Sequence, residues 1–347
     1  MTIVLTGGGT AGHCLPCIAL LPELKKYFSH IVYIGGIDSI EEEIAVKNNL
    51  AYYGITTVKL RRSLTPKNFA IPFKLWKGIK EAKAILKHIK PDVIFSKGGF
   101  VALPVVWAGS SQKIPIISHE SDLTLGLANR LVVRRSRVLC TTFPQTAAKY
   151  KNAIHTGAII RPELSSGERT KIDGFTRNKP NLLVMGGSQG ATAINNAVWN
   201  AAHELLLHYN VLHITGRGKS NPKIKKNNYL QYEYLSAPQN AFAWADVVVS
   251  RAGAGALCEL LSLRKPTVFI PLPKTESRGD QIDNANFMLE SGCCSVLWQE
   301  DLTTENLLKV LEKTLRNRQQ IVTNCEKLDW LDGTQKVIKV IWECIKK

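Results

Sequence analysis

Short apolar segments alternate with longer amphipathic ones along the first half of the chain. Segments of four or five apolar residues predict strands, and segments with a 3.6-residue apolar period predict helices. The predicted strands cover 3–6, 31–34, 93–96, 114–118 and 138–141, and the predicted helices cover about 16–28, 40–48, 71–88 and 126–134. This alternation is typical of a mostly parallel sheet with helices on both faces.

The second half of the chain repeats the same alternation. Strands are predicted at 181–185, 211–215, 229–233, 247–250, 267–270 and 295–297, and helices at 192–209, 254–263, 281–291 and 304–316. A polar segment with glycine and proline, 161–179, is typical of a linker. With 347 residues, two domains are expected. We predict an α/β protein with domains 1–162 and 163–333, and a last helix, 334–347, that crosses back to the first domain.

Each half contains a strand that runs into a glycine-rich turn. The first strand leads into Gly7–His13, and the strand at 181–185 leads into Gly186–Ala191. Glycine leaves room for backbone N–H groups and a helix N-terminus to approach a phosphate. Ligands of open α/β sheets bind beyond the carboxyl ends of the strands. We therefore expect two nucleotide-fold halves that face each other across an active-site cleft.

The first turn also fits the dinucleotide fingerprint G-x-G-x-x-G. A nicotinamide site requires an acid at the end of the second strand, where it binds the ribose hydroxyls. That strand ends in Gly35-Gly36 instead, and the nearest acid, Asp38, lies beyond it. The incomplete fingerprint argues against a nicotinamide enzyme.

The net charge of +17 is concentrated in the first 160 residues, which hold 21 Lys and Arg against 9 Asp and Glu. Segment 61–90 has nine basic residues and one acid, Glu81, with aromatic and aliphatic residues between them. Such a segment either binds an anionic membrane surface or forms a solvated helix face. The chain has neither zinc-finger spacing nor an RNP-type aromatic pattern, so we do not expect nucleic-acid binding.

The composition is that of a soluble globular protein. No apolar run approaches the ~18 residues of a membrane span, and the first strand begins at once, so we expect no secretory leader and a cytoplasmic protein. The eight cysteines are scattered, which favours reduced thiols. Cys14 and Cys17 form a single CxxC, for which packing is a better interpretation than a metal or redox role.

Seven motifs occur in the order and at the spacings of one enzyme family. They are Thr6–His13 with Pro16; Lys97-Gly-Gly-Phe100 with Pro104; His119-Glu120; Gly126 with Asn129; Gly186–Ala191; Ser250–Gly253 with Glu259; and Gln281 with Asn284. The chain resembles the MurG family of bacterial glycosyltransferases over nearly its whole length. These enzymes transfer N-acetylglucosamine from UDP-N-acetylglucosamine to a lipid-linked muramyl-pentapeptide in peptidoglycan synthesis.

The resemblance implies the GT-B fold, inversion at the transferred sugar and a peripheral location on the cytoplasmic face of the cell (inner) membrane. The donor would lie mainly on the second domain, and the acceptor diphosphate near the glycine turns of the first. No Asp-x-Asp pair follows a strand, so we predict neither a cofactor nor a metal site, and the metal requirement stays open.

The resemblance also assigns residues to the donor. Glu259 would bind the ribose hydroxyls of UDP, and a position near a helix start would suit its charge. Ser188 and Arg161 would meet the diphosphate, where negative charge develops as UDP leaves. Gln281 and Asn284 would bind the sugar. The remaining motif positions assigned to substrate binding are Gln189, Asn195, Arg251 and Ala254.

On the acceptor side His13 is the candidate general base, because neutral imidazole can remove the proton of the attacking hydroxyl. Alternatively, His13 only hydrogen-bonds a phosphate. His119 with Glu120 is a second catalytic candidate, although a buried, hydrogen-bonded histidine is an equal alternative. The remaining assigned substrate-binding residues on this side are Thr10, Ala11, Gly12, Asp122 and Asn129.

Several positions depart from the family pattern. Ala11, Phe100, Ala102, Ser121-Asp122, Ala158-Ile159 and Ala256 stand where the family usually has other, often more polar, residues. Asp122 would repel a diphosphate unless Lys97 or Arg130 compensates. Two other functions remain as alternatives: a UDP-N-acetylglucosamine epimerase of similar fold, and a non-catalytic protein that binds a nucleotide sugar.

Overall fold

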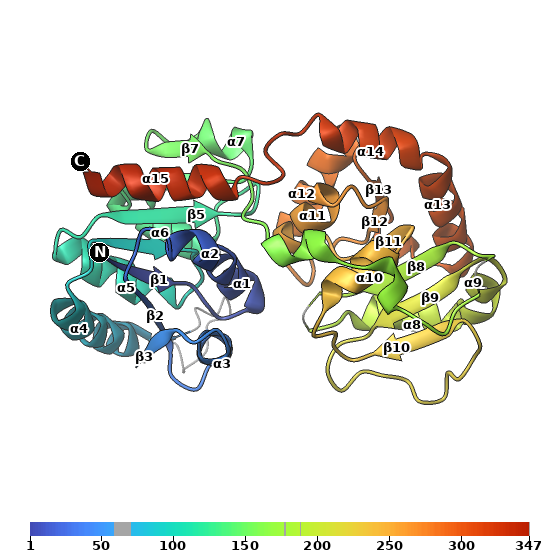
Figure 1. The fold of residues 1–347 in the computed structure, drawn as a ribbon, viewed down its shortest axis with the longest axis horizontal. Coiled ribbons are helices and arrows are strands. Elements are labelled where there is room, and N and C mark those ends of the chain that lie inside the picture. Colours follow the sequence, from blue (N-terminus) through green and yellow to red (C-terminus); the bar gives the residue numbers. More distant parts are fainter. Residues whose placement is uncertain (59–70, 177, 188, 347) are drawn as a thin grey trace. The chain divides into compact units, whose positions relative to one another are not determined.

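The computed structural model describes residues 1–58, 71–176, 178–187 and 189–346. The chain forms two compact units. The first comprises Met1–Arg161 with Asp332–Lys347, and the second comprises Pro162–Leu331. Each unit is a parallel sheet with helices packed against it (Figure 1).

The first unit has a seven-stranded parallel sheet in the order β3-β2-β1-β4-β5-β6-β7. Its strands are β1 (Thr2–Thr6), β2 (His30–Gly36), β3 (Ala51–Ile55), β4 (Val93–Ser96), β5 (Ile116–Glu120), β6 (Val138–Thr141) and β7 (Ala153–His155). Its α-helices are α1 (Ala11–Ala19), α2 (Leu21–Leu24), α3 (Ile40–Lys47), α4 (Ile71–Ile89), α5 (Ala102–Ser111), α6 (Leu127–Val132), α7 (Pro144–Ala147) and α15 (Thr334–Lys346).

Two apolar clusters, one on each face of the sheet, hold the first unit together. Leu86 of α4 and Val106 of α5 belong to one cluster, and Leu24 of α2 and Ile341 of α15 belong to the other. The C-terminal helix α15 therefore belongs to the first unit, where it lies against the sheet (Figure 1). A hydrogen bond from Arg137 Nη1 to the Cys344 carbonyl, 3.2 Å long, adds a polar contact.

The second unit has a six-stranded parallel sheet in the order β10-β9-β8-β11-β12-β13. Its strands are β8 (Asn181–Met185), β9 (Asn210–Ile214), β10 (Tyr229–Tyr232), β11 (Val247–Ser250), β12 (Thr267–Phe269) and β13 (Ser295–Val296). Its α-helices are α8 (Thr192–Asn200), α9 (Ala202–His208), α10 (Pro238–Trp244), α11 (Ala254–Ser262), α12 (Asp280–Glu290), α13 (Thr304–Arg316) and α14 (Arg318–Glu326).

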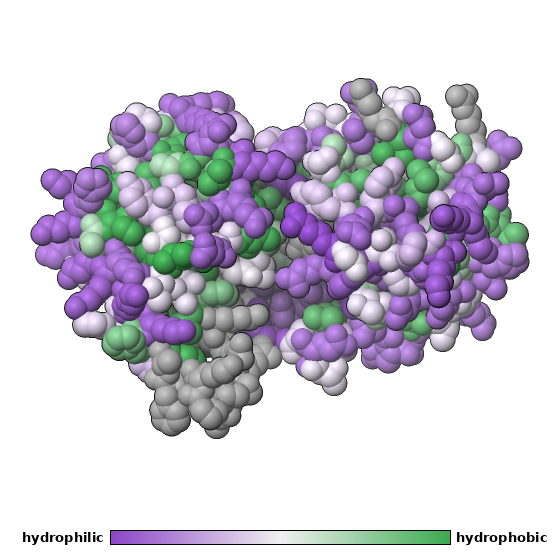
Figure 2. Space-filling view, turned by 90° about the horizontal axis from the view of Figure 1, so that it is seen from below, coloured by the Kyte–Doolittle hydropathy of each residue, from purple (hydrophilic) through white to green (hydrophobic). Residues whose placement is uncertain are grey.

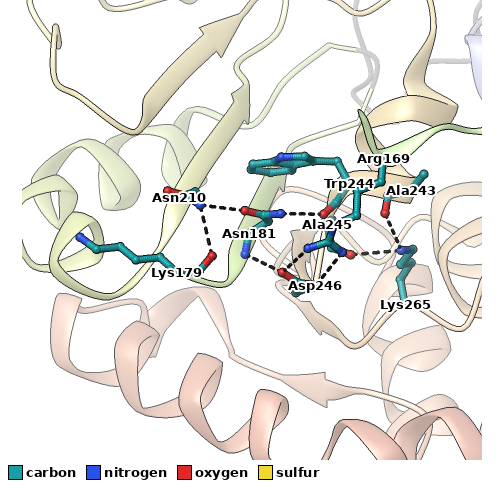
Figure 3. A network of polar contacts seen from close by, with 9 residues as sticks. All are labelled: Arg169, Lys179, Asn181, Asn210, Ala243, Trp244, Ala245, Asp246 and Lys265. Carbon is teal, nitrogen blue, oxygen red and sulfur yellow. Dashed lines mark hydrogen bonds and ion pairs between the residues drawn. The ribbon is translucent and has the colours of Figure 1, made fainter. Parts of the chain in front are cut away.

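The polar segment 161–179 is not a free linker, because most of it packs on the second unit. Arg169 donates two hydrogen bonds to the Asp246 carboxylate, at 2.9 and 3.0 Å, and the same carboxylate accepts from the Asn181 backbone N–H at 2.9 Å (Figure 3). The Asn210 amide donates to the carbonyl oxygens of Thr176 and Lys179. These contacts attach the segment to the amino ends of β8, β9 and β11.

The elements that the sequence did not predict are edge strands, short helices and one buried helix. β3 and β7 lie at the two edges of the first sheet and are five and three residues long. Helix α5 is apolar on nearly all sides and buried, so it has no polar face to reveal a helical period. The single helix predicted at 16–28 is wrong in its start: α1 begins at Ala11 and includes Pro16.

In both sheets the strand order reverses beside the first strand of the unit. β1 lies between β2 and β4, and β8 lies between β9 and β11. Because ligands of doubly wound sheets bind at such reversals, beyond the carboxyl ends of the strands, a ligand site is expected at the turns after β1 and β8. Both are the glycine turns of the sequence.

Candidate functional site

The first glycine turn is packed tightly against the turn that follows β4. The Gly8 N–H donates to the Gly98 carbonyl at 3.4 Å. A Cβ atom on Gly99 would lie 2.3 Å from the Gly8 carbonyl oxygen, which no side chain permits. The Phe100 ring lies against Gly9, where an added Cβ would be 2.2 Å from it. The two turns therefore form one compact edge at the ends of β1 and β4.

Two side chains hold the rear of this turn. Tyr33 Oη donates to the Gly7 carbonyl at 2.6 Å. Glu41, in the first turn of α3, accepts from the Gly9 N–H at 3.3 Å. Neither residue belongs to the motifs from which the site was predicted, and Glu41 stands in a run of three glutamates that resembles an ordinary solvated helix start.

The front of the turn is the N-terminus of α1. Ala11 and Gly12 are its first residues, and among the described residues we find no acceptor for their backbone N–H groups. His13 Nδ1 lies 2.9 Å from Thr10 Oγ1. If Nδ1 carries the proton and donates to Thr10, Nε2 has the lone pair that a base requires. These groups together can receive an anion and a proton.

The second catalytic candidate, His119, is buried. Its Nε2 lies 3.2 Å from the Gly157 carbonyl, so Nε2 carries the proton and Nδ1 does not. Burial, and secondly the charge of Lys97, lower the pKa of His119 well below its ordinary value. The geometry thus favours the buried, hydrogen-bonded alternative for this histidine.

Glu120 organises the loop that follows β5. Its carboxylate accepts from the backbone N–H groups of Asp122 and Gly126 and from Asn129 Nδ2, at 3.1, 2.8 and 3.0 Å. Asn129 is buried, and its amide lies directly against Gly98. Lys97 Nζ donates to Ser121 Oγ, and Arg130 Nε donates to the Leu125 carbonyl. Glu120 and Asn129 therefore shape the loop beside the first turn.

The second glycine turn rests against the end of β9. A Cβ atom on Gly190 would lie 2.0 Å from the Thr215 carbonyl oxygen. Asn195, predicted to bind substrate, is buried in α8 and donates to that same carbonyl at 2.9 Å. Gln189 is exposed in the turn. Ser188, predicted to meet the diphosphate, lies outside the described residues.

Asn195 is the end of a chain of buried hydrogen bonds whose direction is fixed. Trp199 Nε1 can only donate, and it donates to Tyr229 Oη at 3.0 Å. Because the Asn195 amide nitrogen donates to the Thr215 carbonyl, Asn195 Oδ1 accepts from His213 Nε2 at 3.0 Å. The neutral ring then has its lone pair on Nδ1, which accepts from the Tyr229 hydroxyl at 2.9 Å. Burial lowers the pKa of His213 to about 3, so the ring is neutral. Asn195 thus positions the turn through Thr215.

The other donor-side residues surround the carboxyl ends of β11 and β12. Arg251 is buried, and its guanidinium donates to the Ile270 and Pro271 carbonyls and to Gln299 Oε1. Gln281 Oε1 accepts from the Leu272 N–H at 3.1 Å. Arg251 and Gln281 therefore hold the loop after β12 from two sides.

Glu259 does not lie at a helix start. It is the sixth of nine residues in α11, whose first turn contains no acid, so the expected dipole stabilisation is wrong. Its side chain is half-buried. Ala254 begins α11, Asn284 is buried in α12, and Arg161 is the last residue of the first unit before the break.

The CxxC thiols are packed inside the first unit. The thiols of Cys14 and Cys17 face backbone carbonyls of α1 and of the preceding turn, and burial raises the pKa of Cys17 to about 12. Among the described residues no group of three or more His, Cys, Asp or Glu side chains is placed to hold a metal ion. The geometry favours the packing interpretation of Cys14 and Cys17.

Two family models match the two halves of the chain. The glycosyltransferase family 28 N-terminal domain matches residues 3–139, and the C-terminal domain of the same family matches 181–339. The chain belongs to glycosyltransferase family 28. It is 47% identical to a Lachnoclostridium phytofermentans protein named UDP-N-acetylglucosamine–N-acetylmuramyl-(pentapeptide) pyrophosphoryl-undecaprenol N-acetylglucosamine transferase, over 98% of each chain.

Solved structures share the fold over the whole chain. MurG of Acinetobacter baumannii matches with a TM-score of 0.76 and 25% identity, covering 99% of each chain. A UDP-GlcNAc 2-epimerase from Neisseria meningitidis matches with a TM-score of 0.67 and 14% identity, also over 99% of each chain, which shows the fold alone. The predicted class, α/β with two Rossmann-like parallel sheets of the GT-B type, is confirmed.

Because His213 of the second unit is buried and neutral, we predict that the free energy of unfolding decreases in acid. The unfolded His213 has a pKa near 6.5, whereas the folded one has a pKa of about 3. Between these values the unfolded state binds the extra proton, so stability is complete above pH 6.5 and falls as the pH is lowered. From pH 7 to pH 5 we expect His213 to reduce the free energy of unfolding by roughly 1–2 kcal/mol.

Urea unfolding at pH 7, 6 and 5 measures this effect. His213→Asn should lower stability at pH 7 and flatten its dependence on pH, whereas His203→Asn, at an exposed position of α9, should leave both unchanged. If the stability of His213→Asn depended on pH as steeply as that of the wild type, His213 would not be the source of the acid sensitivity.

Proposed function

We propose that the chain is an inverting glycosyltransferase that moves N-acetylglucosamine from UDP-N-acetylglucosamine to lipid-linked N-acetylmuramyl-pentapeptide in peptidoglycan synthesis. The observation that carries the proposal is the 47% identity, over 98% of both chains, to a relative with that named activity. Both domain models of the family also match in the expected order. The chain is accordingly a hexosyltransferase.

The donor would bind at the carboxyl edge of the second sheet. Glu259 is proposed to accept hydrogen bonds from the ribose hydroxyls, and Gln281 and Asn284 to bind the sugar. Arg161 and Ser188 would stabilise the charge that develops on the diphosphate of the departing UDP. Asn195 and Arg251 hold neighbouring backbone in place, which supports a positioning role for both.

The acceptor would bind at the first glycine turn, with its diphosphate at the N–H groups of Ala11 and Gly12. The acceptor hydroxyl attacks the anomeric carbon, the bond from that carbon to the UDP oxygen breaks, and UDP leaves with the electron pair. His13 Nε2 takes the hydroxyl proton as the new bond forms. This role requires the tautomer whose Nδ1–H donates to Thr10.

A membrane-borne acceptor requires a surface that meets the lipid, and α4 offers one. Phe73 and Trp76 are 68% and 53% exposed, and Lys80 Nζ lies 3.8 Å from the Trp76 ring centroid. The acid of this helix, Glu81, accepts two hydrogen bonds from Thr56 and is half-buried. Residues 61–70 of the basic segment lie outside the described residues.

We propose that the α4 surface binds anionic lipid, which would place the enzyme peripherally at the cytoplasmic face of the membrane. Figure 2 shows the surface from the side of α4, where hydrophobic side chains of the first unit lie among hydrophilic ones. Among the described residues no helix has the length and hydropathy needed to cross a bilayer.

The acceptor assay is the central test. Purified protein with UDP-N-acetylglucosamine and the lipid-linked muramyl-pentapeptide should yield glycosylated lipid and UDP in equal amounts, and no sugar should be released without acceptor. Release of epimerised sugar in the absence of acceptor would replace the transferase by the epimerase alternative. Donor binding without either product would support the non-catalytic alternative.

Replacing His13 by Ala separates its two possible roles. As the general base, its loss should lower kcat by about 10²–10⁴-fold, the usual contribution of such a group, with both KM values little changed. A raised acceptor KM with normal kcat would make His13 a phosphate ligand instead. The steady-state constants for each substrate, measured separately, decide between them.

Replacing Phe73 and Trp76 together by Ser should weaken binding to vesicles that contain anionic lipid, because two exposed apolar side chains no longer enter the interface. Co-sedimentation with vesicles of varied anionic content measures this. Leu207→Ser is a matched control, since Leu207 is 59% exposed on α9 of the second unit. Binding that ignores anionic lipid content would contradict the proposed membrane surface.

A further inference from the structure

Glu41 is a buried carboxylate behind the first glycine turn. Glu41 is the second residue of α3, and only 1% of its surface is exposed. Its two oxygens accept from two separate segments: Oε2 from the Gly9 N–H in the first glycine turn, at 3.3 Å, and Oε1 from the N–H of Gly36, the last residue of β2, at 3.2 Å. One carboxylate therefore joins the loop after β1 to the end of β2.

The chain makes room for this carboxylate with three glycines. A Cβ atom on Gly8 would lie 2.6 Å from the Glu41 carboxyl group, one on Gly35 would lie 2.7 Å from its Cγ, and one on Gly36 would lie 3.2 Å from Oε1. The absence of a side chain at these three positions thus leaves the space that the glutamate side chain occupies. Side chains at Gly8 and Gly35 would displace it.

Backbone N–H groups are the polar partners that the structure shows for Glu41. Among the described residues no Lys, Arg or His forms an ion pair with it. A carboxylate that is buried without a cation depends on such N–H donors. This is the arrangement in which a glycine turn binds an external anion, except that here the anion is part of the chain.

We propose that Glu41 is the resident anion of the first glycine turn and the positioning residue of the acceptor site. Its carboxylate turns the Gly9 N–H to the rear, so that the N–H groups of Ala11 and Gly12 at the start of α1 face the substrate diphosphate. The Glu41 side chain also occupies the end of β2, where a dinucleotide enzyme binds ribose. The acceptor part of this inference rests on the proposed function.

A small carboxylate added in solution tests the proposal. Glu41→Ala removes the anion and leaves a space for formate, whereas Glu41→Gln keeps the volume but turns an amide group toward one of the two N–H donors. Glu43→Gln is the matched control, since Glu43 lies exposed on the same helix.

We expect kcat/KM for the lipid acceptor to fall at least about tenfold in Glu41→Ala and Glu41→Gln, because two buried N–H groups lose a charged acceptor. The KM for UDP-N-acetylglucosamine should stay within about twofold, since Glu259, Gln281 and Asn284, the residues proposed to bind its ribose and sugar, lie on the other unit. Formate should restore the acceptor kcat/KM of Glu41→Ala in a saturable way, and it should raise the thermal unfolding midpoint of this variant. Chloride at equal ionic strength should have neither effect. Formate should not restore Glu41→Gln.

The proposal would be overturned if Glu41→Gln kept the wild-type acceptor kcat/KM. It would also be overturned if chloride restored the activity of Glu41→Ala as well as formate does. A rise in donor KM without any acceptor effect would overturn it too. If Glu41→Ala does not fold, Glu41→Asp is compared with Glu41→Gln. A higher acceptor kcat/KM for Glu41→Asp supports the proposal, and a higher value for Glu41→Gln refutes it. The formate effect on unfolding needs no activity, so failure of the transferase proposal is distinguished from failure of this one.

Discussion

Close approach of backbone at the carboxyl edges of the two sheets is the constraint on which the rest of the structure depends. The Gly8 carbonyl lies against Gly99 and the Thr215 carbonyl lies against Gly190, at separations that no Cβ atom allows. These contacts bring the turns of neighbouring strands together without intervening side chains. Consequently α1 and α8 each begin after a short glycine turn, at Ala11 and Thr192, and their first N–H groups lie where ligands of such sheets usually bind.

The two turns differ in how their polar surroundings are satisfied. Behind the second turn, a continuous chain of hydrogen bonds runs from Trp199 through Tyr229 and His213 to Asn195 and the Thr215 carbonyl. At the edge of the first sheet, Thr6 Oγ1, His119 Nδ1, Asn129 Oδ1 and Thr142 Oγ1 are buried and have no protein partner among the described residues. Buried polar atoms without a partner are uncommon in folded proteins, so the polar groups at this edge of the first unit are less completely paired than those behind the second turn.

The sequence predicted the features that leave a local pattern: the five central strands of the first sheet, all six strands of the second, the two glycine turns and the family motifs. It did not predict β3, β7 or α5, because β3 contains a glycine, β7 has only three residues and an all-apolar helix lacks a distinctive period. It also placed Glu259 at a helix start, although α11 begins five residues earlier. Glu41 escaped notice because its contacts join residues of three separate elements, which no spacing rule encodes.

The same fold serves enzymes with different reactions, as the 14% identical epimerase with a TM-score of 0.67 illustrates. Glycine turns and sheet order therefore position a phosphate-bearing ligand but do not choose the chemistry. In the function proposed above, that choice belongs to two side chains placed on the shared frame. They are His13, which contacts Thr10 at the front of the first turn, and Glu41, whose carboxylate binds N–H groups at the rear of the turn. Because Glu41 fills the end of β2, the turn that resembles a dinucleotide fingerprint presents only its front to a substrate.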